Sequence, residues 1–480
     1  MQTHNVVEET TEVVVIGAGM AGLTAATTLG RDTDMVVLES TDRTGGRVDT
    51  VRQGDYWINV GTQFTEGTGT LIEALDRHGI EMGSLAGKSI ALHLNGGTVD
   101  TSNPFALMFR TKMTMLDRFG LALVGSRILA VTPFLESESR VAQRVRARLD
   151  AKLASYLLKG VRSELAHTVV RSWSAQWMGC DLHETAATQF VTSVGMALAD
   201  PEKIPNFSLP AGGNQTLTDV LTADLGARIR LNSVVQSVRN DGDGVVVDYL
   251  DGDRPARLRA RRAIVTAPAD VSERIIPELP QRYRNSFNDI TYGRYVVVGF
   301  FTDEVGPQRW DKYFGISTPQ LSFQAVFNHA AALRTGSDRK PGGALACFAG
   351  GGKADALLDL PDEEIVSRFT DDLLTVLPEL EGKLGEGILR RHRRVVPFWA
   401  PGRRTTLPTL REPFGNIYFA GDYQLDLPSL ADAATSGESA AKAVAASCAG
   451  HVPGASARNS ANATANPGCG NDRSSVPTDR

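Results

Sequence analysis

Three glycines and one glutamate near the start of the chain have the types and spacing of a dinucleotide-binding site. Gly17, Gly19 and Gly22 form the pattern G-x-G-x-x-G, directly after the buried-strand pattern EVVVIG and at the start of the helical pattern AGLTAATTLGR. In such a turn the glycines permit a tight bend, a close approach of backbone to pyrophosphate, and close packing of helix on strand. Glu39 ends the next apolar strand, where a carboxylate accepts hydrogen bonds from ribose hydroxyls and disfavours a 2′-phosphate. The spacing therefore predicts a site for FAD or NAD and disfavours the alternative, a glycine turn that binds no ligand.

Two further motifs favour FAD. Gly46-Arg47 completes the run Arg43-Thr44-Gly45-Gly46-Arg47, and its arginine is placed to reach a second phosphate or the edge of a flavin ring. Near the other end of the chain, Gly421-Asp422 closes the strand pattern NIYFAGD, and Asp422 can accept hydrogen bonds from ribityl hydroxyls. A helix predicted to start near Leu430 points its partially positive N-terminus at the flavin pyrimidine. The sequence has no second G-x-G-x-x-G for a nicotinamide.

The elements around these motifs predict an α/β protein with two domains that are both discontinuous in sequence. A Rossmann-like FAD-binding domain is assigned to 11–98, 206–270 and 391–448. A mixed α+β substrate domain with a helical insert takes 99–205 and 271–390. Residues 449–480 are poor in hydrophobic residues and rich in Gly, Ser, Asn and Pro, so they are predicted to be a disordered tail.

Composition excludes several other classes of protein. The 480 residues are 42% hydrophobic and carry a net charge of −5, which gives no reason to expect nucleic acid as a partner. The four cysteines have no zinc or disulfide spacing and the eight histidines no metal spacing, so we expect no metal and a cytoplasmic location. The N-terminus shows no secretory signal, and Arg127 interrupts the longest apolar run, 119–135, so no membrane crossing is expected.

Within the helical insert, apolar residues recur every four positions opposite an arginine-rich face. These residues are Val141, Val145, Leu149 and Leu153. Such a face is ordinarily solvated.

With these motifs the sequence resembles the FAD-dependent amine oxidase superfamily, which includes monoamine and polyamine oxidases, protoporphyrinogen oxidases and carotene desaturases. The resemblance spans residues 12–447. Its further pieces are VGTQF at 60–64, LPAGGNQTLTDVL at 209–221, IVTAP at 264–268 and YFAGDYQLDLPSLADAATSG at 418–437. The resemblance implies that the Val235 backbone holds the adenine and that Ala267 and Pro268 line the cofactor. It places Gly61, Thr62 and Gln63 near the isoalloxazine. Because the helical insert sometimes touches membranes in this family, the resemblance also implies membrane contact that is at most peripheral.

The sequence departs from the family pattern at three places. The strand before Gly61 commonly carries an acid, and here the residue is Asn59. Amine oxidases of the family place a lysine near flavin N5, whereas YVVVGFF has none and Val296 is predicted to take that position. The C-terminal member of a tyrosine pair that flanks the flavin is replaced within Leu427-Pro428-Ser429-Leu430, a pattern closer to desaturases and porphyrinogen oxidases.

Three residues are candidates for catalysis. Glu66 follows the VGTQF motif and could act as a general base on a substrate N–H or C–H, against the alternative of a solvated loop carboxylate. Gln63 lies in the motif itself. Trp399 could face the flavin ring or be a core tryptophan under a loop. Gly350-Gly351-Gly352-Lys353 lacks the rest of a phosphate loop and is predicted to be a strand-to-helix turn.

These features predict an FAD-dependent oxidoreductase, an oxidase or desaturase, that moves a hydride from a substrate C–H to flavin. Oxygen or another acceptor would reoxidise the flavin. The missing lysine favours a small, largely apolar or cyclic substrate. An amine or amide oxidase acting on a C–N bond, and a non-redox isomerase or cyclase, remain the alternatives. The oligomeric state is not indicated.

Overall fold

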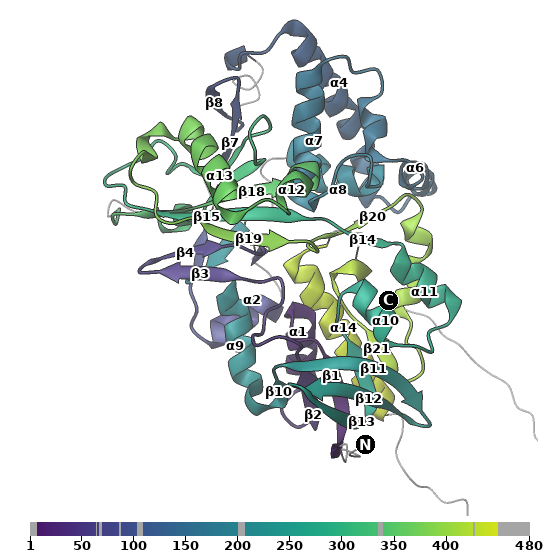
Figure 1. Ribbon diagram of the computed structural model, residues 1–480. Coiled ribbons are helices and arrows are strands. Elements are labelled where there is room, and N and C mark those ends of the chain that lie inside the picture. Colours follow the sequence, from purple (N-terminus) through teal and green to yellow (C-terminus); the bar gives the residue numbers. More distant parts are fainter. Residues whose placement is uncertain are drawn as a thin grey trace, which may run out of the picture.

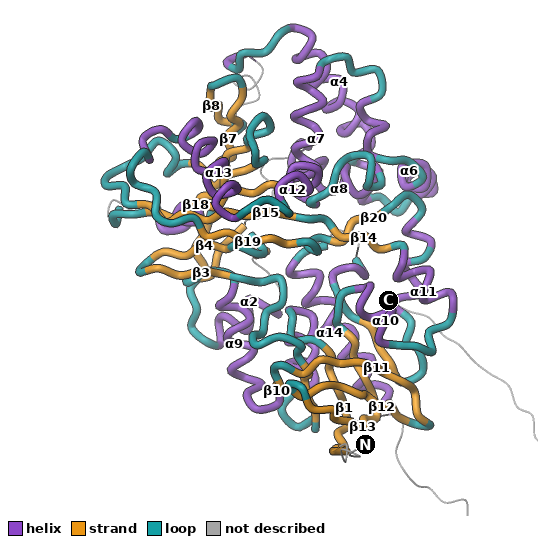
Figure 2. The backbone as a smooth tube through the Cα atoms, viewed as in Figure 1, coloured by secondary structure: helices purple, strands orange, loops and turns teal. Residues whose placement is uncertain are grey.

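The computed structural model describes residues 7–63, 65–66, 70–85, 88–102, 109–199, 207–334, 339–425 and 428–449. These residues form two large sheets and a group of helices, arranged one above the other (Figures 1 and 2). The expected α/β class is confirmed. The predicted tail lies outside the described residues, apart from Ala449.

The first sheet holds the glycine turn and is built from three distant parts of the chain. Its strand order is β10-β2-β1-β13-β12-β11, with β21 also paired to β13. Strands β1, β2, β13, β10 and β21 run parallel where they pair, whereas β11, β12 and β13 form antiparallel pairs. The strands are β1 (Val7–Ile16), β2 (Met35–Leu38), β10 (Ile229–Arg230), β11 (Ser233–Asp241), β12 (Gly244–Asp251), β13 (Arg254–Val265) and β21 (Ile417–Phe419).

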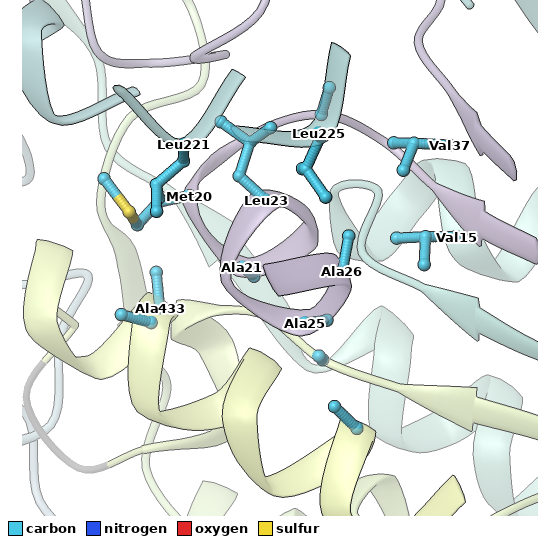
Figure 3. Packing of buried hydrophobic residues seen from close by; sticks show 14 of the residues in the cluster. Val15, Met20, Ala21, Leu23, Ala25, Ala26, Val37, Leu221, Leu225 and Ala433 are labelled. Atoms are coloured by element: carbon cyan, nitrogen blue, oxygen red, sulfur yellow. The ribbon is translucent and has the colours of Figure 1, made fainter. Parts of the chain in front are cut away.

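Helices cover both faces of this sheet. On one face α1 packs between α14, α9 and the strands, with Leu23, Leu221, Leu225 and Val37 in contact (Figure 3). The helices of this face are α1 (Met20–Leu29), α2 (Thr70–Arg77), α9 (Gln215–Leu225) and α14 (Leu430–Ala449). The other face is covered by α10 (Ala269–Ile275), α11 (Gln281–Asn288) and the 3-10 helix η7 (Leu407–Arg411).

The second sheet has the order β19-β15-β18-β17-β16-β7-β8. Its strands are β7 (Ser89–Leu94), β8 (Gly97–Asp100), β15 (Tyr295–Thr302), β16 (Tyr313–Ser317), β17 (Ala325–Asn328), β18 (Gly343–Gly350) and β19 (Ile388–His392). One face packs on α12 (Gly351–Leu357) and α13 (Asp362–Val376). The other packs on the hairpin β3 (Thr50–Gln53) and β4 (Tyr56–Asn59), and on the 3-10 helix η4 (His329–Leu333).

The remaining elements form the helical insert and two small sheets. The insert consists of α4 (Met115–Val131), α5 (Pro133–Glu136), α6 (Arg140–Asp150), η1 (Ala154–Leu158), α7 (Glu164–Met178) and α8 (Ala187–Ala199). The small sheets are β5 (Thr65–Glu66) with β9 (Phe207–Pro210) and β6 (Met82–Ser84), and β14 (Ile290–Tyr292) with β20 (Pro397–Trp399). Short 3-10 helices are η3 (Gly226–Arg228), η5 (Pro378–Leu380), η6 (Arg403–Thr405) and η8 (Asp422–Gln424).

Two expectations about the elements were wrong in detail. Residues 89–98 were assigned to the FAD-binding domain, but β7 pairs with β16 and therefore belongs to the second sheet. Residues 271–288 were assigned to the substrate domain, but α10 and α11 pack on the first sheet. In both cases the sequence pattern marks a strand or helix without showing which sheet it joins, because that choice depends on long-range pairing. The strand-to-helix turn at Gly350-Gly351 is confirmed by β18 and α12.

Candidate FAD site

The glycine turn leaves an open space in front of the α1 N-terminus. Gly17 has φ of +102°, and a Cβ added to Gly22 would lie 1.9 Å from the Gly17 carbonyl oxygen, so neither position admits a side chain. A Cβ added to Gly19, in contrast, would meet no atom within 4 Å. Because α1 has no side-chain cap and no acidic residue in its first turn, its free N–H groups face this space. The turn therefore fits the pyrophosphate of a dinucleotide.

Glu39 lies beside this turn with its carboxylate held by local donors. The backbone N–H of Ala18 donates to Glu39 Oε2 at 2.8 Å, and the Thr41 N–H and hydroxyl each donate to Oε1 at 2.9 Å. The side chain is buried. This geometry brings the expected ribose-binding carboxylate next to the glycine turn, as the spacing predicts.

The β11 strand begins beside Glu39, where the Ser233 N–H donates to the Glu39 carbonyl at 2.7 Å. Its pairing with β12 is irregular at Val235, the residue expected to hold the adenine. The β11–β12 pairing shifts register between Val235 and Ser237. A register shift interrupts the ladder of backbone hydrogen bonds, so groups near Val235 are free for another partner. The adenine contact itself stays a prediction.

Arg47 and Asp422 form the main charged contact of the site. They lie 375 positions apart, and the guanidinium donates to both carboxylate oxygens at 2.7 and 2.8 Å. Burial opposes the charge of Arg47, but Asp422 more than offsets it and raises the pKa of Arg47 above its usual value. The Asp422 side chain is 9% exposed, whereas 40% of the Arg47 side-chain surface is open, so Arg47 is the accessible member of the pair. The sequence predicted that both residues face the cofactor but not that they pair.

Tyr292 connects this ion pair to the other cofactor segment. Its ring centroid lies 5.8 Å from the guanidinium carbon of Arg47, and its hydroxyl accepts from the Ala269 N–H at 2.9 Å. Burial raises the pKa of Tyr292, so the phenol stays neutral. Because α10 begins at Ala269, Tyr292 fixes the half-buried residues Ala267 and Pro268 that precede it. Sequence reasoning missed Tyr292, which no motif marks.

The α14 helix begins at Leu430 as predicted. The Ser429 hydroxyl accepts from the Asp432 N–H at 3.0 Å and caps the helix, and the Gly421 N–H donates to the Ser436 hydroxyl at 2.9 Å. A Cβ added to Gly437 would lie 2.0 Å from the Ala21 carbonyl oxygen, so this glycine lets α14 pack directly on α1. The tight packing positions Gly421 and Asp422 beside the glycine turn. Leu427 lies outside the described residues.

The loop after β4, which carries Gly61, Thr62 and Gln63, is held by uncharged donors. The Asn214 amide donates to the Thr62 carbonyl at 2.8 Å, and His392 Nε2 donates to the Val60 carbonyl at 2.7 Å. Asn59, which stands where the family commonly has an acid, accepts from the Asn214 N–H at 3.0 Å. The loop is therefore fixed without a carboxylate.

Gln63 is held by His329 behind this loop. Its amide nitrogen donates to the carbonyls of Asn59 and Gly61 at 2.7 and 2.8 Å, so its oxygen is the acceptor for His329 Nε2 at 3.1 Å. Burial lowers the pKa of His329 to about 3, and the imidazole is neutral with its proton on Nε2. Gln63 thus points into the protein and acts as a positioning residue for the loop.

The depressed pKa of His329 predicts a loss of stability in mild acid. The unfolded chain protonates this histidine below about pH 6.5 and the folded chain does not, so stability falls as pH falls from 6.5 toward 3. At pH 5 the loss is about 2 kcal/mol. We expect His329→Gln, which keeps an N–H donor for Gln63, to reduce the loss between pH 7 and pH 5 by that amount in urea unfolding. His183→Gln at an exposed position is the matched control. An unchanged pH dependence in His329→Gln would contradict the assignment.

The structure describes the side chains of two of the three catalytic candidates, Trp399 and Gln63, and only the backbone of Glu66. The Glu66 backbone pairs with Phe207, but the Glu66 side chain lies outside the described residues. Trp399 is 1% exposed, and its backbone is bound by Gln189 and Ala186, which favours packing over a contact with flavin. A tryptophan ring that stacks on a bound cofactor needs one accessible face, and the Trp399 side chain has almost no accessible surface. Gln63 stays a positioning residue.

Val296, predicted to stand where the family has its lysine, lies on the face of β15 that points away from the loop at Gly61. Side chains alternate across β15, and Val296 packs with Phe369 and Ala354 on the α12–α13 face, away from the site. Val297 packs with Ile58 and Val60, directly before Gly61. Valine therefore stands on the side of the strand that faces the loop, and β15 contains no lysine.

One cluster outside the site could bind a metal by distance alone. Ligand atoms of Asp181, His183 and Glu184 lie within 4.8 Å of one another. Glu184 already accepts from Arg294 at 2.9 Å and from the Asp181 N–H at 2.7 Å, so we interpret the group as part of an ion pair. Among the described residues, Cys180, Cys347 and Cys448 are free thiols.

Comparisons with known proteins show the family to which the chain belongs. The family of flavin containing amine oxidoreductases matches residues 20–445. The chain is 27% identical over 299 residues to AofH, a putative flavin-containing monoamine oxidase of Mycobacterium tuberculosis, covering 59% of this chain and 63% of AofH, which is less than two thirds of its length. It is 21% identical to coproporphyrinogen III oxidase of Bacillus subtilis, covering 85% and 91% of the two chains.

The fold is that of solved amine oxidases. A putrescine oxidase structure superposes with a TM-score of 0.74 at 20% identity, covering 92% of this chain and 100% of that one. The glycine turn, Glu39 and the Arg47–Asp422 pair all lie within or beside the matched region. The chain therefore belongs to the flavin-containing amine oxidoreductase family, a family of FAD-dependent oxidoreductases.

Proposed function

We propose that the chain is an FAD-dependent oxidase or desaturase that removes a hydride from a C–H bond of a small molecule. The carrying observation is the open space at Gly19, which faces the free N–H groups of α1 and lies beside the Glu39 carboxylate. FAD bound there would supply the hydride acceptor, with oxygen or another oxidant restoring it.

The described residues supply binding and positioning. The α1 N-terminus offers N–H donors and a positive dipole end to phosphate, and Glu39 offers an acceptor to ribose. Arg47 and Asp422 form a bidentate ion pair, so neither brings an uncompensated charge to the site. Gln63, His329 and Asn214 hold the loop at Gly61 and Thr62.

The apolar character of β15 favours oxidation of a C–C bond in a largely apolar or cyclic substrate. Val297 packs among Ile58 and Val60, and β15 contains no lysine. Oxidation of a C–N bond in an amine or amide is the second candidate, because AofH is named a monoamine oxidase and the putrescine oxidase structure was solved with putrescine bound.

Reduction of the bound flavin without oxygen distinguishes the two candidates. The purified, FAD-loaded chain is mixed anaerobically with primary and cyclic amines and, separately, with apolar polyenes and cyclic alkenes, while flavin absorbance is followed. We expect bleaching by the apolar compounds. Bleaching by amines alone would reject desaturation and leave the amine oxidase. Turnover of a substrate with no bleaching and no oxidant consumed would instead indicate a non-redox isomerase or cyclase.

We also propose a cytoplasmic location, which the free thiols of Cys180, Cys347 and Cys448 support. Fractionation of the source cells followed by immunodetection tests this proposal. Recovery of the chain outside the cell would contradict it.

A further inference from the structure

One arginine, Arg403 of η6, is buried with most of its guanidinium unpartnered. The residue is 2% exposed. Its Nη1 donates to the Ser286 carbonyl at 3.0 Å and to the Thr406 hydroxyl at 2.9 Å, and neither acceptor is a carboxylate. Among the described residues, Nε and Nη2 have no hydrogen-bond partner. Burial of a charge with so few partners is costly, so an arginine at this position indicates a role beyond packing.

Arg403 lies behind the segment that carries Asp422. The strand before it, β20, packs on η8 and pairs with β14, between the first sheet and the helical insert (Figure 1). The Ser286 carbonyl that Arg403 binds precedes Phe287, whose ring meets the Tyr423 ring edge-on at a centroid distance of 6.1 Å. Tyr423 directly follows Asp422 in the chain. Arg403 and Asp422 are therefore connected through Tyr423 and the end of α11.

The guanidinium is charged at neutral pH, and its charge reaches this segment. Burial lowers the pKa of Arg403 to about 10, while Asp289, Tyr423 and Tyr292 oppose the shift. In turn, the charge of Arg403 favours a lower pKa for the Tyr423 phenol, against the larger effect of burial, which raises that pKa. Asp289 is exposed, so water screens its charge.

The other charges of the cofactor site are compensated. Arg47 and Asp422 bind each other in bidentate fashion, so their charges largely cancel. Glu39 lies at the glycine turn, where the Ala18 N–H binds its carboxylate. The uncompensated charge behind η8 is that of Arg403. A fixed positive charge in the protein interior stabilises negative charge that develops near it, because the low dielectric constant screens it little.

We propose that the buried charge of Arg403 favours the reduced form of FAD at this site and so raises the reduction potential of the cofactor. The inference rests on the proposed function, in which a hydride from the substrate C–H brings two electrons and one proton to FAD. Arg403 neither gains nor loses a proton in this step. Because its guanidinium is inaccessible, it contacts neither cofactor nor substrate and acts as a positioning residue through its charge.

The reduction potential of the FAD-loaded chain tests the proposal. Arg403→Met removes the charge and keeps a long side chain. At one solution potential, set with a dye of known potential, we expect the ratio of reduced to oxidised flavin to be about tenfold lower in Arg403→Met than in the wild type. For a two-electron couple this is a fall of about 30 mV. An unchanged ratio in Arg403→Met would overturn the proposal.

Two further variants separate charge from packing. Arg403→Lys keeps the charge but not the shape of the guanidinium, so it should restore most of the wild-type ratio. Arg411→Met is the matched control, because this exposed arginine holds η8 by donating to the Gln424 carbonyl at 2.6 Å while water screens its charge. It should leave the ratio unchanged. A shift in Arg403→Lys or in Arg411→Met as large as that in Arg403→Met would assign the effect to packing and overturn the proposal.

FAD titration and thermal unfolding show that each variant is folded and loaded. If Arg403→Met does not fold, Arg403→Gln takes its place, because it is also uncharged and keeps a donor for the Ser286 carbonyl. A wild-type chain that binds no FAD would overturn the proposed function and this inference together. A chain that binds FAD and is reduced by its substrate, but whose ratio does not depend on the charge at Arg403, would overturn this inference alone.

Discussion

Replacing Gly19 with valine is expected to weaken FAD binding about 100-fold, close to 2.7 kcal/mol, while the chain still folds. A Cβ at this position would meet no protein atom within 4 Å, and the residue has an extended backbone conformation with φ of −75° that valine adopts. The valine would occupy the space in front of the α1 N-terminus where the structure fits a pyrophosphate. Titration of the apoprotein with FAD, followed by flavin fluorescence, measures the change.

Gly22→Val is the matched control, since it lies three residues away in the same turn. Its Cβ would fall 1.9 Å from the Gly17 carbonyl oxygen, so we expect loss of the folded state rather than a selective loss of cofactor. If Gly19→Val bound FAD as tightly as the wild type, the pyrophosphate would not lie at this turn.

Removing one member of the Arg47–Asp422 pair is expected to destabilise the chain by about 2–4 kcal/mol when the carboxylate is the residue left behind. Asp422 is 7% exposed, so Arg47→Met leaves a buried carboxylate without its bidentate partner. The lower half of this range is the better expectation, because 40% of the arginine side chain is already open. Urea unfolding of the apoprotein measures the loss, and FAD titration measures the accompanying fall in affinity.

The double variant Arg47→Met/Asp422→Asn completes the test. Because it removes both charges, we expect it to be more stable than the sum of the single losses predicts, by at least about 1 kcal/mol. Additive losses would show that the two residues do not stabilise the fold as a pair.

Local motifs made the cofactor site predictable from sequence. The glycine turn, Glu39 and the start of α14 each depend on spacing within one strand–helix unit, and the structure has them where the pattern predicts. Contacts between distant segments were not predictable in this way. The Arg47–Asp422 pair, the His329–Gln63 hydrogen bond and the Tyr292 contact each join parts of the chain that only the tertiary fold brings together.

Side chains alternate between the two faces of a strand, so a shift of one residue in a predicted position changes the face on which the side chain lies. Val296 and Val297 are adjacent and chemically identical, so the sequence could not show which one faces the loop at Gly61; the packing on either side of β15 shows that it is Val297. Trp399 was a candidate because it is aromatic. Whether an aromatic ring can contact a cofactor depends on its burial, which the sequence does not show, and Trp399 is buried.

The central claim, that this chain holds FAD at the Gly19 turn, is tested most directly by reconstitution of the folded apoprotein with FAD. The account predicts that one FAD binds per chain and that the protein then shows the visible absorbance of oxidised flavin. It also predicts that Gly19→Val requires about 100-fold more FAD to reach the same absorbance. A folded wild-type chain that stays colourless at every FAD concentration would contradict the account.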